Sequence, residues 1–161
     1  MPARNPKSVA KPIYAAKRYV SQDSPVYLMN QLRTKYIATL DSALAEQDIT
    51  AAQWGILRMI FDGRGNTAAA LCRHYGYDTG SMTRMIDRLA DKGLIQRERC
   101  GRDRRQVLLA LTADGEKMVE SGAFKVVAAL NHYLAGFNRD EVELLTNFLR
   151  RMLSNADIEA T

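Results

Sequence analysis

Apolar residues recur at helical spacing over most of this chain, and polar capping residues divide the pattern into segments. The first helix is expected to start at Ser24-Pro25, because serine is a favoured N-cap and proline is tolerated at the first helical position. This helix is expected to run to about residue 47, and its apolar residues are Met29, Leu32, Tyr36, Leu40 and Ala43.

The second helix is predicted from a capping box, in which Thr50 accepts the amide of Gln53 and the glutamine side chain reaches back. This segment is apolar on most of its sides, so we expect it to be a buried central helix. Its apolar residues are Trp54, Ile56, Leu57, Met59, Ile60 and Phe61.

A turn at residues 62–65 precedes a short helix that Asn66 is expected to cap and Gly76 is expected to end. Another helix is expected to begin near Asp78. Two helices joined by a short turn with a glycine form a helix-turn-helix, whose second member is the recognition helix.

Gly93 lies where a glycine commonly ends a helix, and two short apolar runs follow it. We expect residues 94–100 and 106–111 to form strands on either side of an arginine-rich turn. A hairpin in this place is the wing of a winged helix.

Two amphipathic helices complete the chain. Thr112 is expected to cap the first, and Asn138 and Glu141 form a helix-start pair for the second. Their apolar stripes are Val119, Ala123, Val126, Leu130, Leu134 and Phe137, and then Val142, Leu145, Leu149 and Met152. These stripes are too apolar to remain exposed, so we expect a two-fold dimer that presents two recognition helices to a palindromic site.

The predicted fold class is mainly α with a small β-hairpin wing. Residues 50–111 form the winged helix-turn-helix, and residues 23–49 and 112–155 form the flanking dimerisation helices. The proline-interrupted and basic residues 1–22 are expected to be an arm, flexible or a short helix, that is disordered, packs on a partner subunit or touches the DNA backbone. Residues 156–161 form a tail.

Composition narrows the class of protein. The 161 residues fit one domain, contain no apolar run of the ~20 residues needed to span a bilayer, and begin without a secretory signal. We therefore expect a cytoplasmic protein. The sequence contains no Gly-rich phosphate loop, nucleophile motif or paired carboxylates, and Cys72 and His74 do not share a helix face. We expect no enzymatic activity, cofactor or metal site.

The charge is concentrated in one segment. Of the 23 Lys and Arg and 18 Asp and Glu, ten basic and five acidic residues lie between residues 64 and 105, so this segment carries the whole net charge of +5. A basic segment on an otherwise balanced protein indicates either a solvated face or a polyanionic partner.

The motifs favour the polyanion, because the segment resembles the multiple-antibiotic-resistance-regulator (MarR) family of winged-helix transcription factors. The resemblance lies in GSMTRMIDRLADKGLI and RERCGRDRRQVLLALTADG, and the helix order over residues 24–155 also matches. The family implies a dimer that binds double-stranded DNA, usually a repressor released by a small phenolic or aromatic ligand.

In the predicted recognition helix, Met82, Ile86 and Leu89 share one face, which is expected to contact the core. The opposite face is expected to enter the major groove, where Arg84 can bind guanine with two hydrogen bonds or contact a phosphate. The residues expected to bind DNA here are Asn66, Thr67, Thr79, Gly80, Ser81, Thr83, Arg84 and Arg88.

In the wing, the resemblance implies that Arg105 enters the minor groove and that Asp103 orders the hairpin by pairing with an arginine. Arg102 and Arg104 are expected to contact phosphates or to remain solvated. Replacing Arg105 by alanine is expected to weaken operator binding and flatten its salt dependence.

The sequence specifies the signal that would regulate DNA binding less clearly than it specifies the DNA-binding residues. The aromatic-ligand pocket implied by the family maps onto Tyr27, Arg33, Tyr36 and Trp54, although Tyr36 and Trp54 lie on apolar helix faces and fit core positions better. One alternative is a redox-responsive regulator acting through Cys100, which lies among charged residues of the wing, whereas Cys72 fits a buried thiol. Another alternative is a winged helix that serves protein assembly.

Overall fold

The computed structural model describes residues 12–99 and 107–159. Its α-helices are α1 (Pro25–Leu44), α2 (Ala51–Phe61), α3 (Ala68–Tyr75), α4 (Thr79–Asp91), α5 (Ala113–Tyr133) and α6 (Arg139–Glu159). Three short 3-10 helices are η1 (Ala16–Arg18), η2 (Ser21–Asp23) and η3 (Ala45–Gln47), and the strands are β1 (Ile95–Arg99) and β2 (Val107–Leu111). The mainly helical fold with one hairpin confirms the predicted fold class.

The chain divides into two compact units, residues 1–36 and 37–161. In the first unit, η1, η2 and the first part of α1 follow one another, and the Ser24 hydroxyl accepts the amide of Tyr27 at 3.2 Å. The predicted helix start at Ser24-Pro25 is therefore confirmed. The described part of the predicted N-terminal arm contains two three-residue 3-10 turns, η1 and η2, and no helix longer than these.

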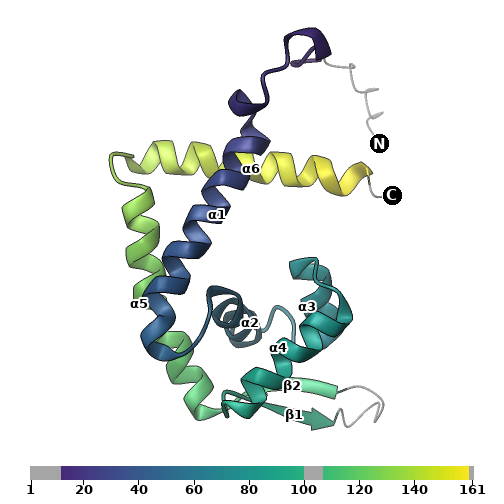
Figure 1. The fold of residues 1–161 in the computed structure, drawn as a ribbon, viewed down its shortest axis with the longest axis vertical. Coiled ribbons are helices and arrows are strands. Elements are labelled where there is room, and N and C mark those ends of the chain that lie inside the picture. Colours follow the sequence, from purple (N-terminus) through teal and green to yellow (C-terminus); the bar gives the residue numbers. More distant parts are fainter. Residues whose placement is uncertain (1–11, 100–106, 160–161) are drawn as a thin grey trace, which may run out of the picture. The chain divides into compact units, whose positions relative to one another are not determined.

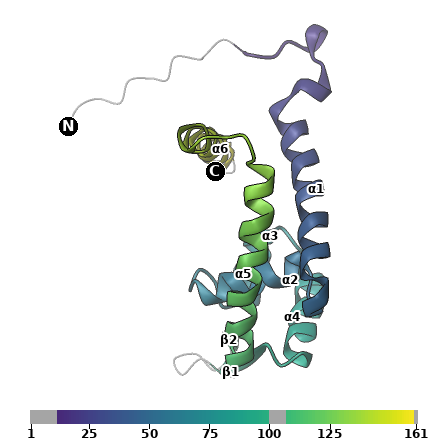
Figure 2. The ribbon, with the colours of Figure 1, turned by 90° about the vertical axis from the view of Figure 1, so that its left-hand side faces the viewer.

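In the second unit, α2, α3 and α4 gather with the hairpin at one end of α5, and α6 leads away from its other end (Figures 1 and 2). Strands β1 and β2 pair antiparallel, from Ile95 opposite Leu111 to Arg99 opposite Val107. The core is formed where these elements meet, and its fully buried large side chains are Leu44, Ile56, Leu57, Leu71, Met82, Leu89 and Val119.

The helix caps follow the sequence closely. The capping box at Thr50 and Gln53 is present, Gly76 ends α3 at φ 67°, and the Thr112 hydroxyl accepts the Gly115 amide at 3.0 Å. One expected cap is wrong. Thr67, not Asn66, caps α3, because the Thr67 hydroxyl accepts the Ala70 amide at 3.2 Å.

Helix α5 is fixed to the winged elements at its N-terminal turn by a close backbone contact. A β-carbon at Gly115 would lie 2.0 Å from the carbonyl oxygen of Leu94, which also accepts the amide of Thr112 at 3.1 Å. Only glycine therefore fits position 115 without moving the main chain.

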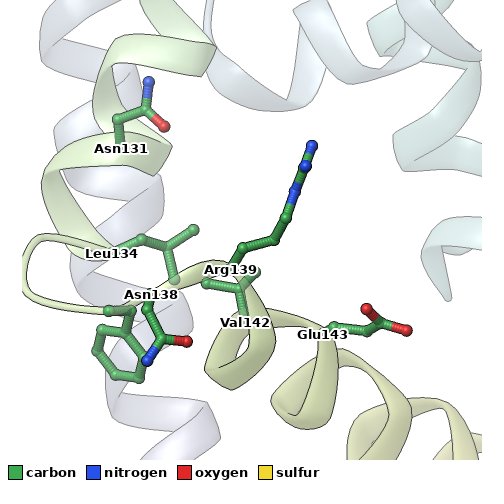
Figure 3. Close-up of a pocket in the computed structure, with 7 residues that line it drawn as sticks. Asn131, Leu134, Asn138, Arg139, Val142 and Glu143 are labelled. Atoms are coloured by element: carbon green, nitrogen blue, oxygen red, sulfur yellow. The ribbon is translucent and has the colours of Figure 1, made fainter.

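The turn from α5 to α6 contains Gly136 at φ 88°, and Asn138 and Glu141 cap α6 reciprocally, as predicted. An open hollow of about 470 Å³ lies at this corner, with Leu134, Asn138 and Arg139 at its edge (Figure 3). None of the helices in the described ranges is long and apolar enough to cross a bilayer.

Candidate DNA-binding interface

The recognition helix α4 begins at an aspartate cap. The Asp78 carboxylate accepts the amide of Ser81 at 2.8 Å, which satisfies one of the free amides of the first turn. Hydrogen bonds from the hydroxyl and then the amide of Ser81 hold the pKa of Asp78 below its usual value, against a small opposing effect of burial. The cap is therefore ionised at neutral pH.

The two faces of α4 separate as the periodicity predicted. Met82, Ile86 and Leu89 are 0, 2 and 0% exposed and belong to the core, whereas Gly80 and Arg84 are exposed. The burial of one face fixes the rotation of the helix, so that the polar face of its first turns is directed outward.

On that outer face, Arg84 donates a hydrogen bond from Nη2 to the Ser81 hydroxyl at 3.0 Å. A β-carbon at Gly80 would lie 3.2 Å from Asp78 Oδ1 and 3.5 Å from Arg84 Nη1. Gly80 thus leaves an opening between a capping carboxylate and an arginine, where a polar base edge or a phosphate can approach the helix backbone closely.

Thr79 and Thr83 differ in their hydrogen bonds and in their neighbours. Both are exposed, but the Thr83 hydroxyl donates to the Thr79 carbonyl at 2.8 Å, and Thr83 also lines a hollow that borders the hairpin at Val107. Arg88, one turn beyond Arg84, is exposed and has no ion-pair partner among the described residues.

The wing is tied to the helix-turn-helix by two contacts that sequence reasoning missed. Arg97 of β1 pairs with Asp87 of α4, and the Leu109 amide of β2 donates to the Asn66 carbonyl at 2.7 Å. Asp87 belongs to the motif that carries the family resemblance, but only the folded chain shows its partner. Asn66 thus contacts the wing through its backbone, while its side chain is exposed.

The C-terminal end of α4 is also held. Lys92 donates from Nζ to the Asp48 carboxylate at 2.6 Å, and the Thr112 hydroxyl donates to the Gly93 carbonyl at 2.6 Å. A recognition helix fixed at its cap, middle and end is suited to reading DNA as a rigid element.

The predicted wing-tip residues Arg102, Asp103, Arg104 and Arg105 lie outside the described residues, as does Cys100. Strands β1 and β2 lead to both ends of this segment, so its place in the chain is that of a wing tip. Cys72 is half-buried and packs against the core.

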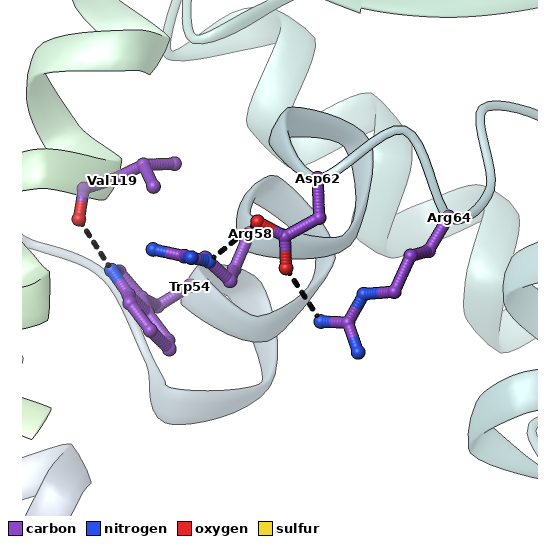
Figure 4. A network of polar contacts seen from close by, with 5 residues as sticks. All are labelled: Trp54, Arg58, Asp62, Arg64 and Val119. Carbon is purple, nitrogen blue, oxygen red and sulfur yellow. Dashed lines mark hydrogen bonds and ion pairs between the residues drawn. The ribbon is translucent and has the colours of Figure 1, made fainter.

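The four residues expected to bind a ligand are divided between the two units. Tyr27, Arg33 and Tyr36 belong to residues 1–36, where Tyr27 accepts a hydrogen bond from Gln31 at 3.1 Å. Trp54 belongs to α2, and its indole nitrogen donates to the Val119 carbonyl of α5 at 3.3 Å (Figure 4).

Trp54 is packed closely enough to require a glycine opposite it. A β-carbon at Gly122 would lie 2.3 Å from its indole nitrogen. This packing fits the core position that the sequence left open for Trp54 and joins α2 to α5. In the part of the chain that the structure describes, no three His, Cys, Asp or Glu side chains gather as ligands for a metal ion.

Comparisons with known proteins agree with this geometry. The model of the MarR family matches residues 49–107. The multiple antibiotic resistance protein MarR of Salmonella typhimurium is 33% identical over 129 residues, which cover 80% of this chain and 88% of that protein.

Solved structures match over the same extent. A mutant MarR from E. coli complexed with operator DNA is 31% identical with a TM-score of 0.71, and the match covers 78% of this chain and 91% of that one. BpsR of Bordetella bronchiseptica, whose DNA binding is regulated by 6-hydroxynicotinic acid, is 23% identical with a TM-score of 0.73, over 83% of this chain and 96% of that one. The latter likeness shows the fold.

Proposed function

Because the chain belongs to the MarR family of winged helix-turn-helix transcription regulators, we propose that it is a dimeric repressor of a palindromic operator in double-stranded DNA. The observation that carries this proposal is the outer face of α4, where Gly80, Ser81 and Arg84 stand opposite a buried core face. A protein acting on chromosomal DNA in this way works in the cytoplasm.

The DNA contacts are assigned by position. Thr79, Gly80, Ser81, Thr83 and Arg84 of α4 are placed in the major groove, and Arg88 contacts a phosphate. Asn66 and Thr67, which precede α3, contact the backbone of the DNA. At the wing tip, Arg105 enters the adjacent minor groove, Arg102 and Arg104 contact phosphates, and Asp103 orders the tip by pairing with an arginine.

A mobility-shift titration on the DNA upstream of this gene and its neighbour tests the proposal. We expect Arg84→Ala to weaken specific binding by about tenfold or more, since a bidentate arginine–guanine contact contributes ~1–3 kcal/mol of discrimination. Arg73→Ala, an exposed arginine of α3, is the matched control for the loss of one positive charge. Weak and sequence-independent binding by the wild type would instead indicate an assembly module.

The dimer proposal rests on the helices outside the winged elements. Large apolar side chains of α5 and α6 are 38 to 78% exposed in the single chain: Phe124, Val127, Leu130, Leu144, Leu145, Phe148, Met152 and Leu153. Such a concentration of exposed apolar side chains is typical of an interface. A second copy covers it in a two-fold dimer, which also spaces two recognition helices.

We propose that a small aromatic or phenolic ligand releases the repressor from DNA, with Tyr27, Arg33 and Tyr36 of the first unit as candidate contacts. The family supports this proposal, and BpsR shows that the fold can couple a small aromatic acid to DNA binding. Dissociation of the protein–DNA complex by a panel of aromatic acids tests it. Arg33→Gln is expected to abolish the response while leaving binding to the operator intact.

A further inference from the structure

A hollow of about 420 Å³ lies between the start of α2 and the end of α4. The polar residues that line it are Asp48, Thr50, Gln53, Arg88 and Lys92. All of them lie outside the apolar faces of α5 and α6 that are assigned to the dimer. We call this hollow the α2–α4 cleft.

The side chain of Gln53 is oriented by the capping box of α2. Its Oε1 accepts the amide of Thr50 at 3.0 Å. Because only the oxygen of the side-chain amide can accept this bond, the positions of Oε1 and Nε2 are fixed. Gln53 is 7% exposed, and its Nε2 donates to no acceptor among the residues that the structure describes. The capping box therefore leaves an unpaired donor on a buried side chain.

This Nε2 group opens to the α2–α4 cleft. Within residues 12–99 and 107–159, the side-chain polar atom that is both enclosed and unpaired is Gln47 Oε1, so Nε2 of Gln53 is not enclosed. Gln53 lines the cleft, which is where a ligand can reach the group. An unpaired donor on a side chain buried to this extent costs free energy unless an acceptor reaches it. The cleft therefore favours a ligand that accepts hydrogen bonds.

Two positive charges face the same cleft. Arg88 is exposed and forms no ion pair within the described part of the chain. Lys92 donates from Nζ to the carboxylate and to the carbonyl oxygen of Asp48, so one of its three N–H donors remains for a ligand. The start of α2 adds the partial positive charge of a helix N-terminus, which Asp41 offsets in part by accepting the Ala51 amide at 2.7 Å.

Asp48 is the anionic group of the cleft. Its side chain is 94% exposed, and its carboxylate pairs with Lys92 at 2.6 Å. An ion pair with one partner so exposed contributes little to stability, because water competes for the carboxylate. A ligand that carries more negative charge can therefore take the place of this carboxylate beside Lys92, so Asp48 competes with an anion without excluding it.

We propose that the α2–α4 cleft binds a terminal phosphate group, either inorganic phosphate or the phosphate of a small monoester. Its oxygens accept hydrogen bonds from Gln53 Nε2, the Arg88 guanidinium and Lys92 Nζ. Three donors from two helices suit the three free oxygens of a terminal phosphate better than the two oxygens of a carboxylate. The phosphates of DNA share this chemistry, but each is linked to a sugar on two sides, so a recessed donor such as Gln53 favours the terminal group.

A phosphate in the cleft would engage Arg88, which the proposed function assigns to a phosphate of DNA. Binding of a phosphate ester would therefore weaken binding to the operator by removing one cationic contact. This effect on DNA rests on the proposed function. The binding of phosphate to the cleft does not.

Phosphorus NMR with the full-length protein measures the binding step. In chloride buffer of constant ionic strength, the wild type is expected to broaden the resonance of inorganic phosphate. Gln53→Glu keeps the capping oxygen for Thr50 but replaces the donor by a negative charge, so the fold is retained and the affinity is expected to fall by about tenfold or more. Equal broadening by the wild type and this variant would overturn the proposal.

Asp48→Asn is expected to have the opposite effect. Asparagine tolerates the left-handed backbone at φ 54° and removes the competing charge, so phosphate should bind severalfold more tightly. Arg88→Gln should weaken binding by about tenfold. Its matched control is Arg73→Gln, an exposed arginine of α3, which should leave the affinity unchanged. An equal loss in the two arginine variants would refute the site, because phosphate would then follow the surface charge in general.

The source of the phosphate group is tested with two small esters. Methyl phosphate is expected to bind the cleft, whereas dimethyl phosphate, which imitates the diester of DNA, is expected to bind at least about tenfold more weakly. Equal binding of the two esters would overturn the preference for a terminal group and assign the cleft to the DNA backbone.

The effect on DNA is measured by operator binding in phosphate and in chloride at equal ionic strength. Phosphate should weaken binding by the wild type more than chloride does, and this difference should disappear in Arg88→Gln. Equal affinity of the wild type in the two salts would contradict the effect on DNA. A wild type that binds phosphate but no specific DNA would refute the proposed function and support the phosphate site.

Discussion

The winged elements bury their apolar side chains within one chain, whereas α6 leaves its apolar side chains in solvent. Leu89 of α4 is 0% exposed and Ile86 is 2% exposed, but Phe148 and Leu153 of α6 are 45 and 67% exposed. Both helices have a clear apolar face, so the pattern along the sequence does not distinguish them. The difference teaches that the winged elements form a core on their own and that α6 needs a second surface.

The largest expected effect is a loss of stability in the winged elements. Gly115→Ala would place a carbon 2.0 Å from the backbone oxygen of Leu94, and because neither main chain can yield cheaply, we expect a loss of about 3 kcal/mol or more in unfolding free energy. Urea unfolding measures this loss. Gly80→Ala is the matched control, since its neighbours are the ends of flexible side chains. Equal stability of the two variants would contradict the close contact.

The next largest effect is expected at the exposed apolar face of α6. Leu145→Asp combined with Phe148→Asp places two charges on the exposed apolar face, so we expect dissociation of the dimer with helical content largely retained. Sedimentation measures the mass. Asn147→Asp combined with Ser154→Asp adds the same charge on the opposite face of α6 and should leave the dimer intact. A dimer that survives the first pair would place the interface elsewhere.

A smaller effect separates stability from DNA binding on α4. Gly80→Ala adds a methyl group on the outer face, where alanine improves helix propensity by up to ~1 kcal/mol and Asp78 must shift slightly. We expect a melting temperature close to that of the wild type and an operator affinity reduced by about tenfold. If affinity stayed at the wild-type level, close approach at Gly80 would not contribute to binding.

The smallest effect concerns pH. The pKa of Asp78 is lowered in the folded protein, so its stabilising contribution is present above the usual value of 3.8 and is lost as pH falls through the lower folded value. Asp78→Asn keeps a capping oxygen but cannot ionise. The stability difference between wild type and variant should therefore shrink on acidification, as measured by unfolding at several pH values. A difference that is constant with pH would mean that the charge of Asp78 contributes nothing.

Local chemistry made much of the fold predictable. Thr50, Gly76 and Thr112 act at the positions that their sequence neighbours indicated, because caps and left-handed turns depend on residues three or four apart. Asn66 and Thr67 are adjacent, and both residue types are favoured N-caps, so the sequence alone did not indicate that Thr67 caps α3.

Contacts between distant segments were not predictable. The pairs Asp87–Arg97 and Lys92–Asp48 join different elements, and any of several charged neighbours fits such a pair until the chain is folded. For Trp54, the sequence left a ligand contact and a core position open. The glycine opposite it, Gly122, lies far along the chain, and only the fold brings the two together.

The bond between the Leu109 amide and the Asn66 carbonyl has a consequence for self-association. A two-stranded sheet presents unpaired edge groups, which are a template for adding strands from other molecules. The segment before α3 occupies one of these groups on β2, directly beside the wing. Because the Asn66 carbonyl covers the Leu109 amide, a strand from another molecule cannot pair with β2 at this position.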